Sequence, residues 1–336
     1  MERNGASKVP AAATTAKAIA GPSVASRALF ALSAAVMRPF TALLPSNAVG
    51  VCGLDVILRA FLAVASAPRR GLTTTPVDTA YDGRRVRGEW VCAPGVDPDG
   101  AAVLYIHGGA FVACSPRTHR GLIGELSASS GRPVFAVEYR KAPRHRFPCA
   151  ADDALAAYEW LTSTGRTVAV AGDSAGGQLA VATTLAARRH GLPDPAAVLL
   201  YSPALDLTGA LALALDGRRR DAFAPARRVA PTFALYVGDA DPCEELLSVL
   251  DADVAGFPPT MIHVGSTEML LDDSRRLAQC LRDAGVTVIL HVARGQIHVF
   301  PAMFRFVPEA RTAIQQSGTF LADHLEFGAA REPFTA

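Results

Sequence analysis

A glycine-rich turn at residues 172–177, with the sequence GDSAGG, separates a short aliphatic run from a long alanine-rich stretch. The run at 168–171 predicts a buried strand, and the pattern at 175–189 predicts a helix. Small residues on both sides of Ser174 let a strand reverse sharply into a helix, which leaves the serine strained with its Oγ exposed. The helix directs its positive end, including the Ala175 N–H, at the same point. The turn therefore predicts a nucleophile at Ser174.

A glycine-rich loop after a strand is also typical of phosphate-binding sites and of plain turns. A Walker phosphate loop needs Gly-Lys followed by Ser or Thr, whereas this chain has Gly177-Gln178-Leu179. No GxGxxG pattern follows the strand either. The nucleophile is therefore the favoured interpretation of the turn.

From residue 76 onward, short apolar runs alternate with longer helical patterns. Asp82-Gly83 is a strong turn signal before the run at 86–92, which predicts a hairpin at the edge of a sheet. Further strands are expected at 103–106, 133–137, 168–171, 197–201, 260–264 and 286–292, and helices at 150–161, 175–189, 273–284 and 310–324. Such alternation is typical of an α/β fold with a mostly parallel central sheet and helices on both faces.

Composition divides the chain into three parts. Residues 1–24 are rich in Ala, Thr and Ser and have no clear apolar face, which predicts a mobile tail. Residues 25–70 contain apolar stretches broken by prolines, so we expect two or three short helices that form a cap. Residues 71–336 are expected to form the catalytic domain. Within it, residues 206–231 lack a strong period and carry five arginines, which predicts an excursion that forms a second segment of the cap.

Charge and cysteine patterns limit the kinds of partner. Lys and Arg total 33 and Asp and Glu total 31, so the net charge of +2 argues against nucleic acid and favours a small-molecule partner. The six cysteines lie far apart, with no CxxC pair and no Cys/His cluster at zinc spacing. We therefore expect no metal and no organic cofactor, and a reducing, cytoplasmic compartment.

The amino-terminal region leaves two interpretations open. No uninterrupted apolar run reaches the ~18 residues that a membrane-spanning helix needs, so a spanning segment is not expected. Between Arg3 and Asp55 there is no acidic residue but several basic ones, which favours weak attraction to an anionic membrane surface. The other interpretation is a cap that packs on the enzyme. The sequence favours no particular oligomeric state.

A second glycine motif, HGGAF at residues 107–111, follows the strand expected at 103–106. Adjacent glycines let the backbone approach a substrate closely and turn its N–H groups toward a developing oxyanion. Together with the serine turn later in the chain, this loop predicts the second half of an oxyanion hole. His107 has no metal-ligand partner at a suitable spacing, so we expect it to fix the loop.

A general base is expected near the carboxyl end of the sheet, after the acid along the chain. Of the five histidines that follow Ser174, only His298 lies in a loop directly after the last expected strand. His190 precedes every candidate acid, and the others lie inside expected strands or late in the final helix. His298 is therefore the predicted general base.

The acid lies after the strand expected at 260–264, where three carboxylates follow in order: Glu268, Asp272 and Asp273. Glu268 is nearest the strand end, from which a carboxylate can reach the imidazole and stabilise its charged form. Asp272 and Asp273 lie at a helix start, where acidic residues usually complement the dipole. Glu268 is the first choice for the acid and Asp272 the second.

From about residue 100 to 325 the chain resembles the bacterial hormone-sensitive-lipase-like carboxylesterases, a branch of the α/β-hydrolases. The family's HGGG motif appears here as HGGA at 107–110, and its GDSAGG motif stands at 172–177. Residues 139–148 (YRKAPRHRFP) are similar to its YRLAPEHPFP, and residues 202–208 (SPALDLT) to its SPWxDLT. The resemblance implies an α/β-hydrolase fold with a helical cap and no cofactor.

By the same resemblance, Ser174 is the nucleophile, His298 is the base, and the N–H groups of Gly108, Gly109 and Ala175 form the oxyanion hole. The family's DPLxDE segment falls on residues 268–273 (EMLLDD), so a glutamate stands where the family has its catalytic aspartate. This departure lengthens the acid by one methylene and keeps its charge. Two further departures are an alanine at 110 for the last glycine of HGGG and an arginine at 144 for the glutamate of APEH.

These residues predict a serine carboxylesterase, or lipase-like hydrolase, that acts on short to medium acyl esters through an acyl-enzyme. An acyltransferase or an amide hydrolase with the same triad stays open as an alternative. A ligand-binding protein is a third interpretation, because the plant gibberellin receptors resemble this family but lack its histidine. The presence of His298 and Glu268 favours catalysis.

Overall fold

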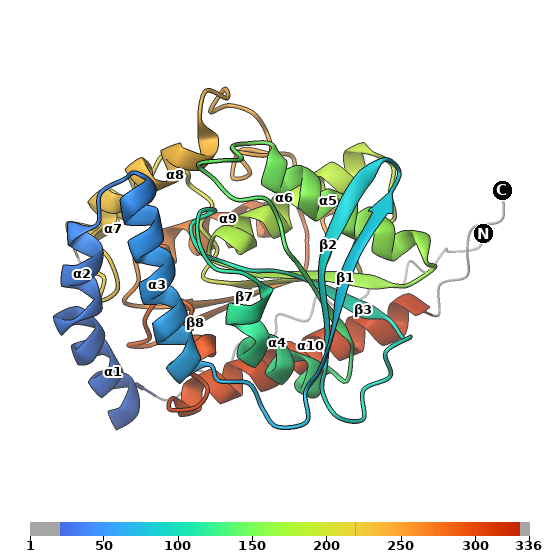
Figure 1. The fold of residues 1–336 in the computed structure, drawn as a ribbon, viewed down its shortest axis with the longest axis horizontal. Helices are drawn as coiled ribbons and strands as arrows, with labels where there is room; N and C mark the ends of the chain where they lie inside the picture. Colours follow the sequence, from blue (N-terminus) through green and yellow to red (C-terminus); the bar gives the residue numbers. More distant parts are fainter. Residues whose placement is uncertain (1–20, 219, 330–336) are drawn as a thin grey trace, which may run out of the picture.

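The computed structural model describes residues 21–218 and 220–329, so most of the tail expected at 1–24 lies outside the described residues. In the described part, eight strands form one sheet in the order β1-β2-β4-β3-β5-β6-β7-β8 (Figure 1). The β1–β2 and β2–β4 pairs are antiparallel, and all other neighbouring pairs are parallel. This mostly parallel sheet confirms the predicted α/β class.

The strands lie close to the expected apolar runs. They are β1 (Thr73–Tyr81), β2 (Arg84–Cys92), β3 (Ala102–Ile106), β4 (Val134–Val137), β5 (Val168–Asp173), β6 (Val198–Tyr201), β7 (Thr260–Gly265) and β8 (Val288–Ala293). Asp82 and Gly83 join β1 to β2 with positive φ values of 47° and 71°, as a tight hairpin turn requires. Every residue of β3 to β7 is buried, which explains why these strands are continuous apolar runs in the sequence.

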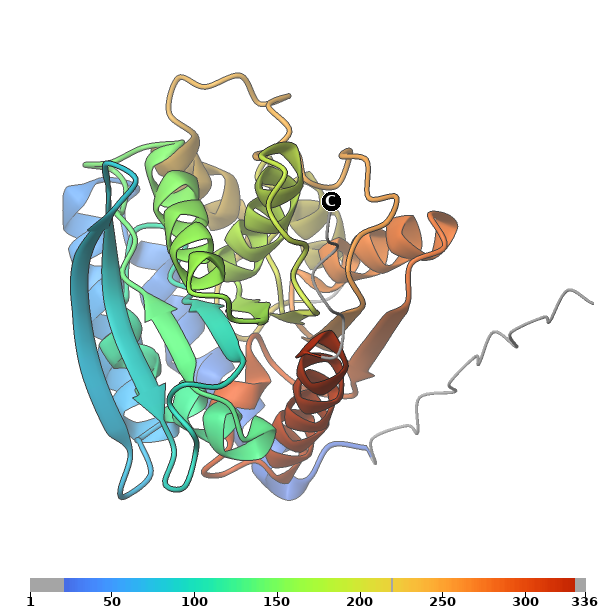
Figure 2. The same ribbon diagram turned by 90° about the vertical axis from the view of Figure 1, so that its right-hand side faces the viewer.

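Helices cover both faces of the sheet (Figure 2). On one face, α4 (Pro116–Ser130) packs against α10 (Pro308–Ala329); on the other lie α5 (Cys149–Ser163), α6 (Ala175–Arg189) and α9 (Leu271–Asp283). The helix α4 is absent from the predicted ones because its Gly- and Ser-rich sequence hides the apolar period. Its start does carry a signal, since Ser115 and Thr118 form a capping box around Pro116.

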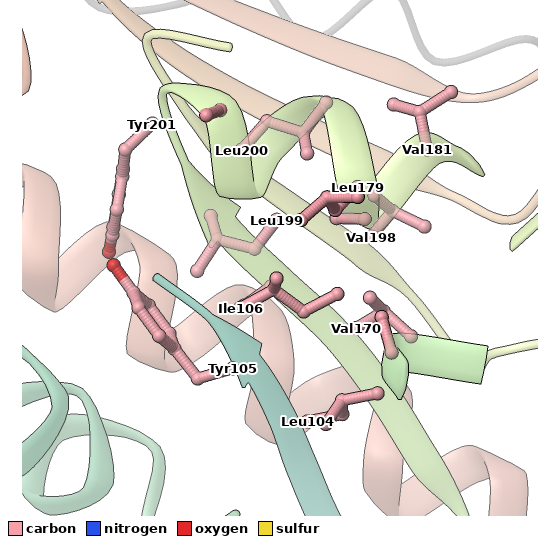
Figure 3. Packing of buried hydrophobic residues seen from close by; sticks show 14 of the residues in the cluster. Leu104, Tyr105, Ile106, Val170, Leu179, Val181, Val198, Leu199, Leu200 and Tyr201 are labelled. Carbon is pink, nitrogen blue, oxygen red and sulfur yellow. The ribbon is translucent and has the colours of Figure 1, made fainter. Parts of the chain in front are cut away.

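The central strands form a rigid platform for the residues at their carboxyl ends. Leu104 and Ile106 of β3 project to one side of the sheet and Tyr105 to the other (Figure 3). Leu199 of β6 and Leu179 of α6 belong to the same fully buried cluster. Each such side chain contributes about 1.5–3 kcal/mol through its removal from water. The ends of these strands are therefore held in fixed positions.

Three amino-terminal helices, α1 (Val24–Ala35), α2 (Met37–Leu43) and α3 (Ala48–Ala65), lie outside the sheet at one end of the molecule (Figure 1). The start of α1 is tied to α10, because the Ser23 N–H donates to Glu309 Oε1 at 2.6 Å. The middle of α3 is tied to the loop after β3, because the Cys114 N–H donates to Asp55 Oδ1 at 2.8 Å. These contacts fix the helices beside the carboxyl edge of the sheet.

The segment 206–231 leaves the sheet after β6 and packs against α2. It contains α7 (Ala210–Asp216), a 3-10 turn (Ala226–Arg228) and the start of α8 (Val229–Val237). The Thr41 hydroxyl of α2 donates to the Phe223 carbonyl at 2.9 Å, and the Arg38 guanidinium donates to the Ala224 carbonyl at 3.2 Å. The amino-terminal helices and the segment 206–231, which lie far apart in the sequence, are therefore joined into one continuous layer.

The contact between α3 and α4 gives a test of this arrangement. A Cβ atom on Gly121 of α4 would lie 1.6 Å from the Ser66 carbonyl oxygen at the end of α3. We expect Gly121→Ala to lower the free energy of unfolding by about 1–3 kcal/mol, because this overlap outweighs the ~1 kcal/mol gain in helix propensity. Calorimetry would measure the lower melting temperature.

Gly100→Ala is the matched control, since a Cβ there meets no atom closer than 3.8 Å. Equal melting temperatures for the two variants would mean that α3 is not held against α4.

Candidate active site

The turn between β5 and α6 holds Ser174 in a strained conformation. Its backbone lies at φ 53° and ψ −121°, outside the regions that L-residues favour. The reversal needs glycine on both sides: a Cβ on Gly172 would lie 2.3 Å from the Gly176 carbonyl oxygen, and one on Gly176 would lie 2.0 Å from the Ile106 carbonyl oxygen. The close approach to β3 therefore fixes where the serine hydroxyl points.

Three of the predicted residues form one chain of contacts. Ser174 Oγ lies 3.0 Å from Nε2 of His298, and Nδ1 of the same ring lies 2.6 Å from Oε2 of Glu268. The serine comes from the elbow after β5, the acid from the loop after β7 and the histidine from the loop after β8. The three loops meet because the carboxyl ends of parallel strands lie at one edge of the sheet. The arrangement can move a proton from the serine to the imidazole.

Glu268 is almost fully buried and is held by more than the histidine. Its Oε1 accepts hydrogen bonds from the Gly265 N–H and from the Ser202 hydroxyl, the latter at 2.7 Å. The Ser202 oxygen in turn accepts the Val299 N–H at 3.0 Å, so one hydroxyl links the acid to the backbone beside the histidine. Ser202 was not among the predicted site residues, although it begins the SPALDLT segment.

The other two candidate acids lie elsewhere. Asp272 Oδ1 pairs with Arg275 at 3.0 Å on α9. Asp273 Oδ1 accepts the N–H groups of Leu205 and Asp206, each at 2.8 Å. Neither carboxylate makes a hydrogen bond or ion pair with His298 within the described ranges, so the structure brings only Glu268 to the imidazole.

A second buried carboxylate, Asp221, lies close to the same loops. Its Oδ2 accepts the Met269 N–H at 2.8 Å, directly after the acid, while its Oδ1 accepts the Phe223 and Ala224 N–H groups. Burial raises the pKa of Asp221, and the charge of His298 together with these hydrogen bonds partly offsets the increase. No sequence motif indicated this residue, because it lies in the aperiodic excursion.

Charge around His298 favours its protonated form. Burial acts to lower the pKa of the imidazole, but the hydrogen bond and charge of Glu268, with the charges of Asp221 and Asp173, outweigh it. The pKa therefore lies above the ordinary value of 6.5. An imidazole of this kind accepts a proton readily and stays stabilised once charged.

In the loop at 107–111, one of the three predicted donors to the oxyanion is already hydrogen-bonded within the protein. The Gly108 N–H donates to Asp173 Oδ1 at 3.0 Å, so it is engaged within the protein and the assignment of Gly108 to the oxyanion hole is wrong. A Cβ on Gly108 would also lie 2.3 Å from the same carboxylate, which shows how closely the two approach. Gly109 and Ala110 follow with φ values of 120° and 54°. Within residues 21–218 and 220–329, the N–H groups of Gly109, Ala110 and Ala175 donate to no acceptor.

Asp173 organises this loop from inside the protein. Besides Gly108, its carboxylate receives the Tyr105 hydroxyl at 2.7 Å and lies 3.4 Å from Nε2 of His119. Burial acts to raise its pKa, but His119 and these hydrogen bonds lower it overall, which keeps Asp173 ionised. His107, expected to fix the loop, stacks on Tyr139 with ring centroids 4.3 Å apart. Neither Tyr105 nor His119 was among the predicted residues.

A largely apolar cavity of about 170 Å³ opens at Ser174 and His298. The amino-terminal segment, the excursion and α8 together supply more than half of the lining residues, including Leu54, Leu58, Phe61, Phe223 and Phe233. Ala110 and Met303 line it from the catalytic side. In the part of the chain that the structure describes, no three His, Cys, Asp or Glu side chains are grouped so that they could hold a metal ion.

Comparisons with known proteins agree with this geometry. Residues 103–302 match a family described by the α/β-hydrolase fold. The carboxylesterase/phospholipase LipF of Mycobacterium tuberculosis is 35% identical over 90% of this chain and 83% of its own length. The acetyl-hydrolase of Streptomyces hygroscopicus is 39% identical over 66% of this chain and 76% of its own.

Among solved structures, an esterase from the bacterial hormone-sensitive lipase family superposes with a TM-score of 0.81 at 32% identity. The match covers 90% of this chain and 99% of that structure. The predicted resemblance is confirmed, and it extends well beyond the motifs on which it was based. This chain therefore belongs to the α/β-hydrolases, in the branch of the bacterial hormone-sensitive-lipase-like esterases, and is a serine hydrolase that acts on esters.

Proposed function

We propose that this protein hydrolyses carboxylic esters through an acyl-enzyme on Ser174, with His298 as the general base and Glu268 as the acid. The contacts of 3.0 Å and 2.6 Å that join the three side chains carry this proposal. The negative charge of Glu268 stabilises the imidazolium that forms when the serine gives up its proton. The engaged Gly108 leaves Gly109, Ala110 and Ala175 as the N–H donors to the oxyanion.

The reaction proceeds in two halves. Ser174 Oγ attacks the ester carbonyl while its proton passes to Nε2 of His298, and the three N–H groups bind the tetrahedral oxyanion. The carbon–oxygen bond to the alcohol then breaks, and the imidazolium protonates the departing alkoxide oxygen. Water attacks the acyl-enzyme in the second half and gives its proton to His298. The histidine returns this proton to Ser174 Oγ as the carboxylic acid leaves.

The cavity favours short to medium acyl chains. Its volume of about 170 Å³ is smaller than the ~300–1,000 Å³ of pockets that hold drug-sized ligands. Relatives point the same way: one is named an ethyl acetate hydrolase of Pseudomonas putida, and a related esterase structure was soaked with p-nitrophenyl butyrate. A p-nitrophenyl ester series from acetate to palmitate would give the preferred chain length.

Variants of the three side chains test the assigned roles. We expect Ser174→Ala to lower kcat/KM for p-nitrophenyl butyrate about 10⁴-fold or more, and Glu268→Gln about 10²- to 10⁴-fold. Asp272→Asn is the matched carboxylate control on the neighbouring helix, with a change of no more than about twofold. Mass spectrometry after treatment with an organophosphate should show one adduct, on Ser174.

Loss of activity in Asp272→Asn with little change in Glu268→Gln would overturn the assignment of the acid. Full activity on amides but none on esters, or transfer to an added alcohol in preference to water, would replace ester hydrolysis with one of the alternative reactions.

The pH profile tests the electrostatics of the histidine. Because the base acts in its neutral form and its pKa is raised, we expect kcat/KM to increase with pH through a midpoint above 6.5. Glu268→Gln removes the group that raises the pKa of His298 most, so the remaining activity of this variant should have its midpoint at a lower pH. Asp221→Asn should produce a smaller shift in the same direction, since its carboxylate acts on the imidazole only through its charge. An unchanged midpoint in both variants would contradict this account.

We also propose that the enzyme works in the cytoplasm and binds weakly to the surface of a membrane through α1, α2 and α3. All six cysteines are unpaired, as in a reducing compartment. Eight of the eleven exposed large apolar side chains among the described residues belong to these helices or to the residue that joins α1 to α2: Val24, Leu32, Val36, Phe40, Leu43, Val49, Val56 and Val64. We call this set the amino-terminal apolar face.

A lipid surface fits the amino-terminal apolar face by charge as well. Asp55 is the one acidic residue of residues 24–65, and it pairs with Arg59 at 2.6 Å, whereas Arg27 is exposed without an ion pair among the described residues. By length and hydropathy alone the helix α3 could cross a membrane, and only 17% of its residues are buried. Its inner side lines the cavity, so it is placed to lie on a bilayer and not to cross it.

Vesicle flotation of the full chain tests this attachment. We expect the protein to float with vesicles of phosphatidylcholine and phosphatidylglycerol, and the double variant Leu32→Glu, Phe40→Glu to stay at the bottom of the gradient. The matched control is Val292→Glu, which changes an exposed apolar residue of the edge strand β8; this variant should still float with the vesicles. If the wild type does not float and is a dimer that the double variant breaks, a second copy covers this face and the proposal fails.

A further inference from the structure

Among the described residues, one guanidinium lies in the wall of the largely apolar cavity. Arg228 ends the 3-10 turn Ala226–Arg228, and its half-buried side chain lines the same cavity as Ser174 and His298. Its Nη2 donates to the Ser46 hydroxyl at 3.0 Å, across the seam between the excursion and the loop after α2. Ser46 lines the cavity as well.

Arg228 has no carboxylate partner within residues 21–218 and 220–329, unlike a second arginine at the same seam. The guanidinium of Arg38 lies 3.4 Å from the Asp216 carboxylate and also donates to the backbone carbonyls of Asp221 and Ala224. Arg38 and Thr41 therefore already join α2 to the excursion through hydrogen bonds to its backbone. The charge of Arg228 is not required for this contact.

A partly buried cation without a counter-ion is unfavourable, because burial removes part of its hydration. A guanidinium has five N–H donors in a planar fork, and Ser46 accepts one hydrogen bond from it. The free part of the fork matches the two oxygens of a carboxylate and would bind them with charge-assisted hydrogen bonds. A ligand that brings a carboxylate into the cavity would supply the missing charge.

The other charged groups of the cavity do not compete for that ligand. Asp173 is engaged by Tyr105, Gly108 and His119, and His298 is engaged by the acid. The exposed arginines of the excursion, Arg218, Arg220 and Arg227, do not line the cavity, so Arg228 is the arginine placed to meet a ligand there.

We propose that Arg228 forms an anion subsite, and that the preferred substrates are esters with a carboxylate several apolar carbons away from the scissile carbonyl. Monoesters of dicarboxylic acids and acyl esters of hydroxy acids have this form. The apolar wall, including Leu54 and Phe61, would hold the carbon chain between the two ends. This inference rests on the proposed ester hydrolysis and names the substrate class of the same site.

Matched pairs of esters test the subsite. Mono-p-nitrophenyl esters of glutaric and adipic acid are compared with the uncharged p-nitrophenyl esters of monocarboxylic acids of equal chain length. The quantity compared is the ratio of kcat/KM for the anionic ester to kcat/KM for the neutral ester. A second arm uses acetate esters of ω-hydroxy acids and of simple alcohols, which places the carboxylate on the alcohol side. We expect Arg228→Gln to lower the anionic-to-neutral ratio about ten- to a hundredfold in one arm, as loss of a charged hydrogen bond does.

Arg228→Lys keeps the charge without the fork and should restore part of the ratio. Arg227→Gln is the matched control, since it removes an exposed arginine next in the chain and should leave the ratio within about twofold. A ratio that is equal in the wild type and in Arg228→Gln, in both arms, would overturn the subsite.

The neutral esters keep the two proposals apart. If the wild type hydrolyses neutral esters but its ratio does not depend on Arg228, only the anion subsite fails. If the folded wild type hydrolyses no ester of either kind, the proposed hydrolysis fails, and the subsite fails with it.

Discussion

The close approach of the β5–α6 turn to β3 is the constraint on which the active site depends. Gly176 touches the carbonyl of Ile106 so closely that no side chain fits, and this contact holds Ser174 at positive φ. The same backbone reversal separates two neighbouring side chains. Asp173 turns inward to Tyr105 and Gly108, whereas the next residue turns outward to the imidazole. One turn therefore positions the nucleophile and shapes the loop that faces it.

The longer acid is accommodated by the loops around it. Glutamate has one more rotatable bond than aspartate, so it needs more contacts to hold a fixed geometry. Ser202 and the Gly265 N–H hold one carboxylate oxygen, which leaves the other for the histidine at 2.6 Å. Asp221 adds a second negative charge near the ring and binds the N–H of the residue after the acid. The loop after β7 is thus fixed from both sides.

Local patterns in the sequence predicted the strands and the three members of the chain of contacts. Buried parallel strands are continuous apolar runs, and the order of serine, acid and histidine along the chain favoured His298 as the base. The acid stayed open between Glu268, the first choice because it is nearest the strand end, and Asp272. Gly108 was assigned wrongly because its N–H is taken by Asp173, a residue 65 positions away that no local pattern connects to it. Ser202 and Asp221 escaped notice for the same reason. Their contacts exist only after β6, β7 and the excursion have come together.

The amino-terminal helices have apolar residues on two sides, and this explains why their sequence left two interpretations open. An ordinary surface helix is polar on its outer side, so its period shows which side is buried. Here Leu54 and Leu58 line the cavity while Val49, Val56 and Val64 of the same helix are exposed. An ester with a carboxylate at one end of an apolar chain is itself amphiphilic and gathers at lipid–water boundaries. If both proposals hold, the same wall would contact lipid on its outer side and present Arg228 beside its inner side, which suits a substrate of that kind.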